Sequence, residues 1–154
     1  MLGLYVTQMG PLTQQLFLGA AFDDFLVSEA SFQTSFRSEF DGQLAEEDAA
    51  EPCITWKQLR PIAYQLIKGK TLPRSFQIVF RLSNEKMAAF LAAISSPFTP
   101  QDVRGLFLNL RFAHKQLSLT TGCLFAEFSM DRELEKAWDK QVLRFLDKIG
   151  VTAE

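Results

Sequence analysis

Apolar and polar residues alternate along several stretches of the chain, with the two-residue period of strands that bury one face. The clearest stretch is residues 75–82, where every second side chain is large and apolar: Phe76, Ile78, Phe80 and Leu82. The same alternation predicts strands at residues 24–31 and 33–41, or one long bent strand, because no strong turn dipeptide separates the two. A short strand is also predicted at residues 2–7.

Other segments have the three- to four-residue apolar spacing of helices that cover a core. One helix is predicted at about residues 11–18, and a second begins at Thr55, which forms a capping-box pattern with Gln58. Pro61 lies inside the apolar stripe of this second helix, so we expect either a kink there or a start nearer to it. Gly69 ends the helix in this interpretation.

Two more helices are predicted from their capping residues. Ser83 occupies the N-cap position of a helix through about residue 94, and Asp131 that of a C-terminal helix that Gly150 ends. The apolar residues of the C-terminal helix recur in helical register: Leu134, Trp138, Val142, Phe145 and Ile149.

Three closely spaced strands are predicted between these last two helices, at residues 105–112, 116–121 and 123–129, with turns at Ala113–Lys115 and at Thr121–Gly122. Helices and strands do not alternate regularly, which argues against a parallel doubly wound sheet. The sequence therefore predicts one α+β domain over residues 1–154. We expect a largely antiparallel mixed sheet with a C-terminal three-strand meander, covered by about four helices.

Phenylalanine is unusually frequent, with 15 Phe against 2 Tyr in 154 residues. A Phe ring has no polar group that must stay hydrated, so most of these rings should be buried. From strand parity and helical register we expect the following core residues: Phe32, Phe36, Phe76, Phe80, Phe107, Trp138 and Phe145.

Charge is sorted into blocks along the chain. Residues 21–51 hold nine acids and one base, whereas residues 52–84 hold six bases and no acid, although the whole chain has a net charge of only −2. Residues 43–52 are acidic and poor in large apolar side chains, which predicts a mobile loop. The two blocks of opposite sign could pair with each other or could each meet a partner.

Catalytic and metal-binding motifs do not stand out. His114 is the only histidine, and the predicted fold puts it at the far end of a strand from Cys123, outside hydrogen-bond reach. Cys53 follows the acidic loop, and nearby negative charge lowers the reactivity of a thiol. A cation site of Asp23 or Asp24 with Asp41 has no recognisable spacing. We therefore expect no cofactor and no required metal, and we rank enzymatic activity third, behind the two binding functions given below.

The sequence shows neither a recognisable signal peptide nor an apolar run long enough for a membrane-spanning helix. The N-terminal residues lack the basic and apolar regions of a signal peptide, and the longest apolar run is too short to span a bilayer. Two cysteines far apart in the chain favour reduced thiols. We expect a cytoplasmic protein that has no disulfide and does not bind a membrane.

Several stretches together resemble a known family: 60–61, 66–70, 76–80, 99–103, 105–111, 120–122, 134–135 and 138–139. The family consists of short, uncharacterised bacterial proteins from anaerobic Firmicutes and is known only as a domain of unknown function. The acidic residues 46–51 and the Cys-Leu pair after Thr121–Gly122 depart from its pattern. The resemblance implies a cytosolic single domain and supplies no activity.

The basic segment, residues 57–81, is the best candidate for a binding surface. Five of its residues flank one predicted helix and the following turn: Lys57, Arg60, Lys68, Lys70 and Arg74. Such a cluster suits an acidic protein partner, and we predict a non-enzymatic interaction or adaptor domain with a polarised acidic and basic surface. The alternative is a nucleic acid or phosphorylated ligand. The cluster could also pair with the acidic block.

Overall fold

The computed structural model describes residues 2–44, 51–69, 72–127 and 132–154. Six antiparallel strands form one sheet in the order β1-β6-β5-β4-β2-β3, and each neighbouring pair runs in opposite directions. The strands are β1 (Gly3–Tyr5), β2 (Leu26–Gln33), β3 (Arg37–Phe40), β4 (Ser75–Arg81), β5 (Val103–Ala113) and β6 (Gln116–Phe125).

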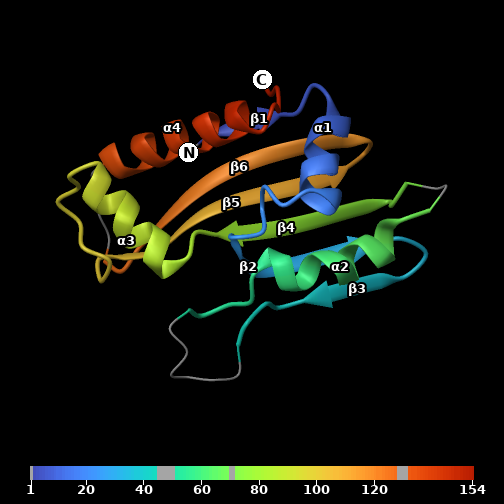
Figure 1. The fold of residues 1–154 in the computed structure, drawn as a ribbon, viewed down its shortest axis with the longest axis horizontal. Coiled ribbons are helices and arrows are strands. Elements are labelled where there is room, and N and C mark those ends of the chain that lie inside the picture. The colour runs from blue at the N-terminus through green and yellow to red at the C-terminus, as the bar shows by residue number, and fades with distance from the viewer. Residues whose placement is uncertain (1, 45–50, 70–71, 128–131) are drawn as a thin grey trace.

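The helices gather on one face of this sheet (Figure 1). They are α1 (Met9–Thr13), which continues into the π-helical segment η1 (Gln14–Leu18), then α2 (Trp56–Ile67), α3 (Asn84–Ala93) and α4 (Glu133–Lys148). The buried residues of the helices and of the sheet form a single hydrophobic cluster. The described residues therefore confirm the predicted α+β class and the largely antiparallel sheet.

Local sequence explains where the central helices begin. The Thr55 side chain accepts from the backbone N–H of Gln58, and the Gln58 side chain accepts from the Thr55 N–H, so the predicted capping box is present. The helix begins at Trp56, and Pro61 lies inside it without delaying its start. Ser83 caps α3 as predicted, because its hydroxyl oxygen accepts from the N–H of Lys86.

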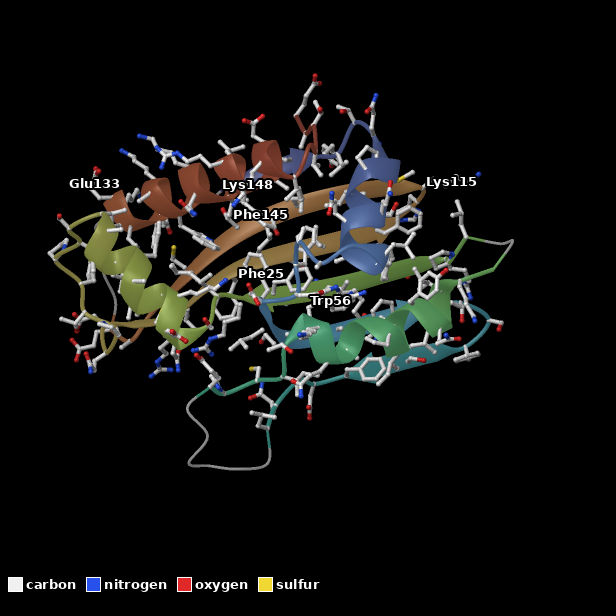
Figure 2. All side chains as sticks on the ribbon, viewed as in Figure 1. Phe25, Trp56, Lys115, Glu133, Phe145 and Lys148 are labelled. Carbon is white, nitrogen blue, oxygen red and sulfur yellow. The ribbon has the colours of Figure 1, made fainter. Side chains whose placement is uncertain are left out.

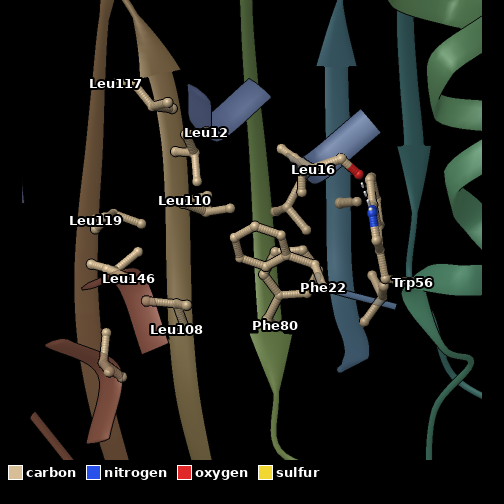
Figure 3. Packing of buried hydrophobic residues seen from close by; sticks show 14 of the residues in the cluster. Leu12, Leu16, Phe22, Trp56, Phe80, Leu108, Leu110, Leu117, Leu119 and Leu146 are labelled. Carbon is tan, nitrogen blue, oxygen red and sulfur yellow. Dashed lines mark hydrogen bonds between the residues drawn. The ribbon is translucent and has the colours of Figure 1, made fainter. Parts of the chain in front are cut away.

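The alternation of β4 shows how the sheet divides into two faces. Phe76, Ile78 and Phe80 are buried under the helices, whereas Gln77 and Val79 between them point to the other face and stay partly exposed. Figure 3 shows the buried side, where the Trp56 indole donates a 2.7 Å hydrogen bond to the carbonyl oxygen of Leu16. Phe22 stacks on Phe80 nearby, at 5.3 Å between ring centroids.

The second face of the sheet carries mostly polar side chains, and strand register arranges them in rows across the strands. One row crosses all six strands: Tyr5, Ser118, Arg111, Gln77, Ser31 and Glu39. A second row joins the strand ends on one side of the sheet: Gln116, Ala113, Ser75, Gln33 and Arg37. We call this second face the open face, because the helices in Figure 1 all lie on the other side.

Two of the predicted core residues are not in the core. Phe36 lies between β2 and β3 and is 59% exposed, because residues 34–36 form the turn that reverses the chain. Phe107 is half-buried and faces the open side, since its neighbours Leu106 and Leu108 take the buried positions of β5. The prediction was right for Phe32, Phe76, Phe80 and Trp138, which are buried, and Phe145 packs against the core.

The predicted three-strand meander is instead a two-strand hairpin. Thr121 and Gly122 do not turn, because β6 continues through both of them while pairing with β5. Strands β2 and β3 are separate, as one of the two interpretations predicted. The predicted mobile loop, residues 43–52, and the predicted cap Asp131 fall largely or wholly outside the described residues, which omit 45–50 and 128–131.

Candidate functional site

The acidic block contacts the basic block through an ion pair and contacts α3 at its first turn. Arg60 Nε and Nη2 donate to the two carboxylate oxygens of Asp23, at 2.9 and 3.0 Å, and both side chains are largely buried. Lys86 Nζ lies 3.1 Å from an oxygen of Asp24 on the surface. Glu51 accepts from the Asn84 N–H at 2.7 Å, at the N-terminus of α3, where a negative charge is favourable. Part of the charge sorting therefore serves the fold.

The five predicted binding residues are dispersed in the structure. Lys57 is exposed at the start of α2, and Lys68 is exposed at its C-terminal end. Arg60 is the partner of Asp23, and Lys70 lies outside the described residues. Arg74 is exposed just before β4 and lines a groove on the open face.

This groove, which we call the basic groove, lies where the strand ends meet. It has a volume of about 900 Å³ and is walled by the 72–74 segment and the β5–β6 hairpin. Its described lining residues are Ser31, Phe32, Gln33, Arg37, Leu72, Pro73, Arg74, Ser75, Phe76, Gln77, Arg111, Phe112, Ala113, His114 and Lys115. The size is in the range of small-ligand sites in proteins.

The electrostatics of the basic groove are one-sided. Arg37, Arg74, Arg111 and Lys115 line it, and none of its described lining residues is a carboxylate. Arg37 is paired with Glu39 at 2.5 Å, with both side chains well exposed. Across the described parts of the chain, no ion pair joins Arg74, Arg111 or Lys115 to an acid. The groove is therefore a site of positive potential that favours anions.

The hairpin tip of the groove has an unusual backbone. His114 and Lys115 form the two-residue turn between β5 and β6, and both have positive φ, 53° and 63°. Figure 2 shows Lys115 at that end of the sheet. Two-residue turns of this kind strongly favour Asn-Gly, because a side chain larger than glycine crowds the left-handed backbone. The chain instead places a cation and an imidazole there, a local cost that often marks a functional position.

The basic groove extends across several strands of the sheet. Arg37 and Ala113 occupy the same row, three strand spacings apart, which is about 14 Å at about 4.8 Å per spacing. A single phosphate reaches donors only about 3 Å from each of its oxygens. An anion that uses the whole groove therefore carries several charged groups along its length.

Sequence reasoning identified only Arg74 among these groove residues. It missed Arg37, Arg111, His114 and Lys115, because they come from separate segments that only the sheet brings together. One usable signal was present, since Arg111 has the parity of the polar face of β5. Another was the placement of His114 and Lys115 at a tight hairpin turn without glycine. The predicted turn at Ala113–Lys115 is present, and the His114 side chain in it is exposed.

The two thiols are free and poorly suited to nucleophilic chemistry. Burial raises the pKa of the Cys123 thiol to about 12, with smaller contributions from Glu135 and Asp139. The pKa of Cys53 is also raised, chiefly by burial and less by Asp41 and Glu51. Both thiols are therefore protonated at neutral pH, and the thiolate is the reactive form.

The described residues form neither a cluster suited to a metal ion nor a helix suited to span a membrane. No group of three or more His, Cys, Asp or Glu in ranges 2–44, 51–69, 72–127 and 132–154 could hold a metal ion. Asp23 and Asp24 instead contact Arg60 and Lys86. None of the described helices is both long and apolar enough to cross a bilayer.

Comparison with known proteins identifies a family and no activity. Searches of curated proteins and of solved structures found no match. The model of a protein family, described as a family of unknown function (DUF5721), matches residues 15–154, which include the whole of the basic groove. The chain therefore belongs to the DUF5721 family.

Proposed function

We propose that the protein is a non-enzymatic binding protein that takes a phosphate-bearing polyanion in the basic groove. The observation that carries the proposal is the set of cations around that groove, with no carboxylate among its described lining residues. Arginine donates through a planar fork that matches the oxygens of phosphate, and Arg74 and Arg111 supply two such forks. Ser31, Gln33 and Gln77 add neutral polar groups to the lining of the same groove.

A phosphorylated ligand was the alternative that the sequence left open, and we retain it with a different binding surface. The binding surface is the open face, with Arg74 as the one predicted residue in the groove, rather than the whole basic segment around α2. An adaptor role with an acidic protein partner would use the same cations, so the test includes an acidic peptide. We place the binding in the bacterial cytoplasm, because reduced thiols are usual there and both cysteines are free.

The test measures binding of a short inorganic polyphosphate chain and of an acidic peptide of equal charge. The test variant is Arg74→Gln with Arg111→Gln, which removes two groove cations. The matched control is Lys140→Gln with Arg144→Gln, which removes two exposed cations of α4 that lie outside the groove lining. Each charge-assisted hydrogen bond contributes about 1.5–3 kcal/mol, so the test variant, which loses two arginines, should bind polyphosphate at least about 100-fold more weakly.

Three results would contradict the proposal. The first is wild-type protein that shows no salt-sensitive binding of polyphosphate. The second is an equal loss in the control variant, which would indicate general charge attraction. The third is tight binding of the acidic peptide with no binding of polyphosphate, which would support the adaptor role instead. Weak peptide binding beside tight polyphosphate binding supports the proposal.

A further inference from the structure

A second groove continues the basic groove around the 72–74 segment. It has a volume of about 590 Å³ and shares Leu72 and Arg74 with the basic groove. Its described lining residues are Thr34, Ser35, Phe36, Gln65, Leu66, Ile67, Lys68, Leu72 and Arg74, with no acid among them. We call it the apolar groove, because four large apolar side chains line it beside two cations.

Two of these apolar side chains are unusually exposed. Phe36 is 59% exposed and Leu72 is 69% exposed, although burial of such large apolar side chains would stabilise the fold. The backbone holds them near each other, since the Thr34 N–H donates to the Phe36 carbonyl oxygen at 2.9 Å and the Arg74 N–H donates to that of Gln33 at 2.8 Å. Both bonds anchor these segments at the end of β2.

The ligand chemistry follows from an exposed aromatic ring beside a groove that several cations line. Resting on the proposed function, we propose that the polyanion is a single-stranded nucleic acid. Its phosphates lie in the basic groove, and one of its bases stacks on the ring of Phe36. Proteins that bind single strands combine a positively charged groove for the backbone with aromatic side chains for the bases.

Three observations favour this occupant. The basic groove extends over the backbone from Arg37 of β3 to Ala113 of β5, about 14 Å, which gives room for a chain of several phosphates. Phe36 stands beside Arg37 in the chain and shares the apolar groove with Arg74, so ring and charge act on adjacent parts of one ligand. The bases of a single strand are unpaired, so they can turn outward and offer a face to the ring.

The test compares three ligands that share charge but differ in their bases. They are a single-stranded hexanucleotide, the same hexanucleotide with every base removed, and the inorganic polyphosphate chain. Binding to wild-type protein is compared with Phe36→Ala, Phe36→Trp and the control Leu18→Ala, which removes an equally exposed side chain (62%) outside both grooves. Stacking of a base on an aromatic ring supports an affinity gain of about tenfold or more.

We expect a difference in affinity between the intact and the base-free hexanucleotide, and we expect this gap in affinity to depend on Phe36. Wild-type protein and Leu18→Ala should bind the intact hexanucleotide about tenfold more tightly than the base-free one, and Phe36→Ala should lose that gap. Polyphosphate binding should not change in Phe36→Ala. Phe36→Trp should keep the gap in affinity. The hexanucleotide should also quench the fluorescence of the introduced indole, and this signal can be told from that of the native Trp56 and Trp138 because both are buried.

The pattern of binding across the three ligands shows whether the nucleic-acid assignment fails alone or together with the proposed function. Equal binding of the intact and base-free strands, with polyphosphate binding retained, overturns the nucleic-acid assignment alone. No binding of any of the three ligands by wild-type protein overturns both proposals. Binding of an acidic peptide that requires Phe36, without binding of the hexanucleotide, overturns this inference in favour of a protein segment as the occupant.

Discussion

The two faces of the sheet are built from the same strands and differ in almost everything else. On the covered face, side chains such as Phe32, Ile78 and Leu108 are at most 1% exposed and pack under the helices. On the open face, most of the intervening residues are polar or charged, and several of them line the basic groove at one end. We therefore expect substitutions on the covered face to change stability and substitutions on the open face to change the proposed binding.

The largest expected effect is a loss of stability on the covered face. Phe80 is fully buried and contacts the rings of Phe22, Phe25 and Trp56, so Phe80→Ala should cost about 3–5 kcal/mol in free energy of unfolding. Ser31→Ala on the open face should change it by less than about 0.5 kcal/mol. Urea denaturation of both variants measures the contrast. A loss below about 1 kcal/mol for Phe80→Ala would contradict the assignment of faces.

A second contrast separates two bases of the same helix α2. Arg60→Gln leaves the nearly buried carboxylate of Asp23 without its paired donors, and we expect a loss of about 2–3 kcal/mol. Lys57→Gln, on an exposed side chain of the same helix, should have little effect on stability. Denaturation midpoints test this difference, and equal losses in both variants would show that the Arg60 pair is not structural.

A change in the β5–β6 turn should affect stability less than the losses at Phe80 and Arg60, and with the opposite sign. His114→Asn with Lys115→Gly gives the hairpin the residues that its left-handed turn favours, so it should stabilise the protein by about 1 kcal/mol. The same variant removes one cation and the imidazole of the basic groove, so polyphosphate binding should weaken. A variant that is more stable and binds less well would show that the turn residues serve binding.

Ser95→Gly is the matched control for this turn variant. Ser95 also has positive φ, 53°, at the end of α3, where its N–H donates to Ala92 and that of Ser96 donates to Leu91. At the corresponding position of α4 the chain has Gly150. The substitution should also stabilise, because glycine suits this backbone, but it should leave polyphosphate binding unchanged. Weaker binding in Ser95→Gly would indicate that stabilisation itself lowers affinity.

The sequence predicted the covered face well, because the patterns that define it each lie within one helix or one strand. The caps Thr55 and Ser83, the alternation of β4 and the register of Trp138 each depend on residues a few positions apart. Phe36 was misplaced because parity alone does not reveal a turn. Thr121–Gly122 was misread as a turn because its pairing with β5 is a long-range property.

The basic groove could not be predicted in the same way. Its cations come from β3, the segment before β4, β5 and the β5–β6 turn, and only strand order brings them together. Charge sorting along the chain pointed instead to residues 52–84, where Arg60 turned out to pair with Asp23. A charge count reports which residues are present, whereas antiparallel register decides which of them share a surface.

The salt dependence of oligonucleotide binding tests the central claim most directly. For single strands, the slope of log K against log salt concentration changes by about 0.7 for each phosphate contact. The account predicts a steep slope for the wild-type protein and a slope reduced by about 1.4 in Arg74→Gln with Arg111→Gln. The slope of Lys140→Gln with Arg144→Gln should equal that of the wild type. A flat wild-type slope, or equal reductions in both double variants, would contradict the assignment of binding to the open face.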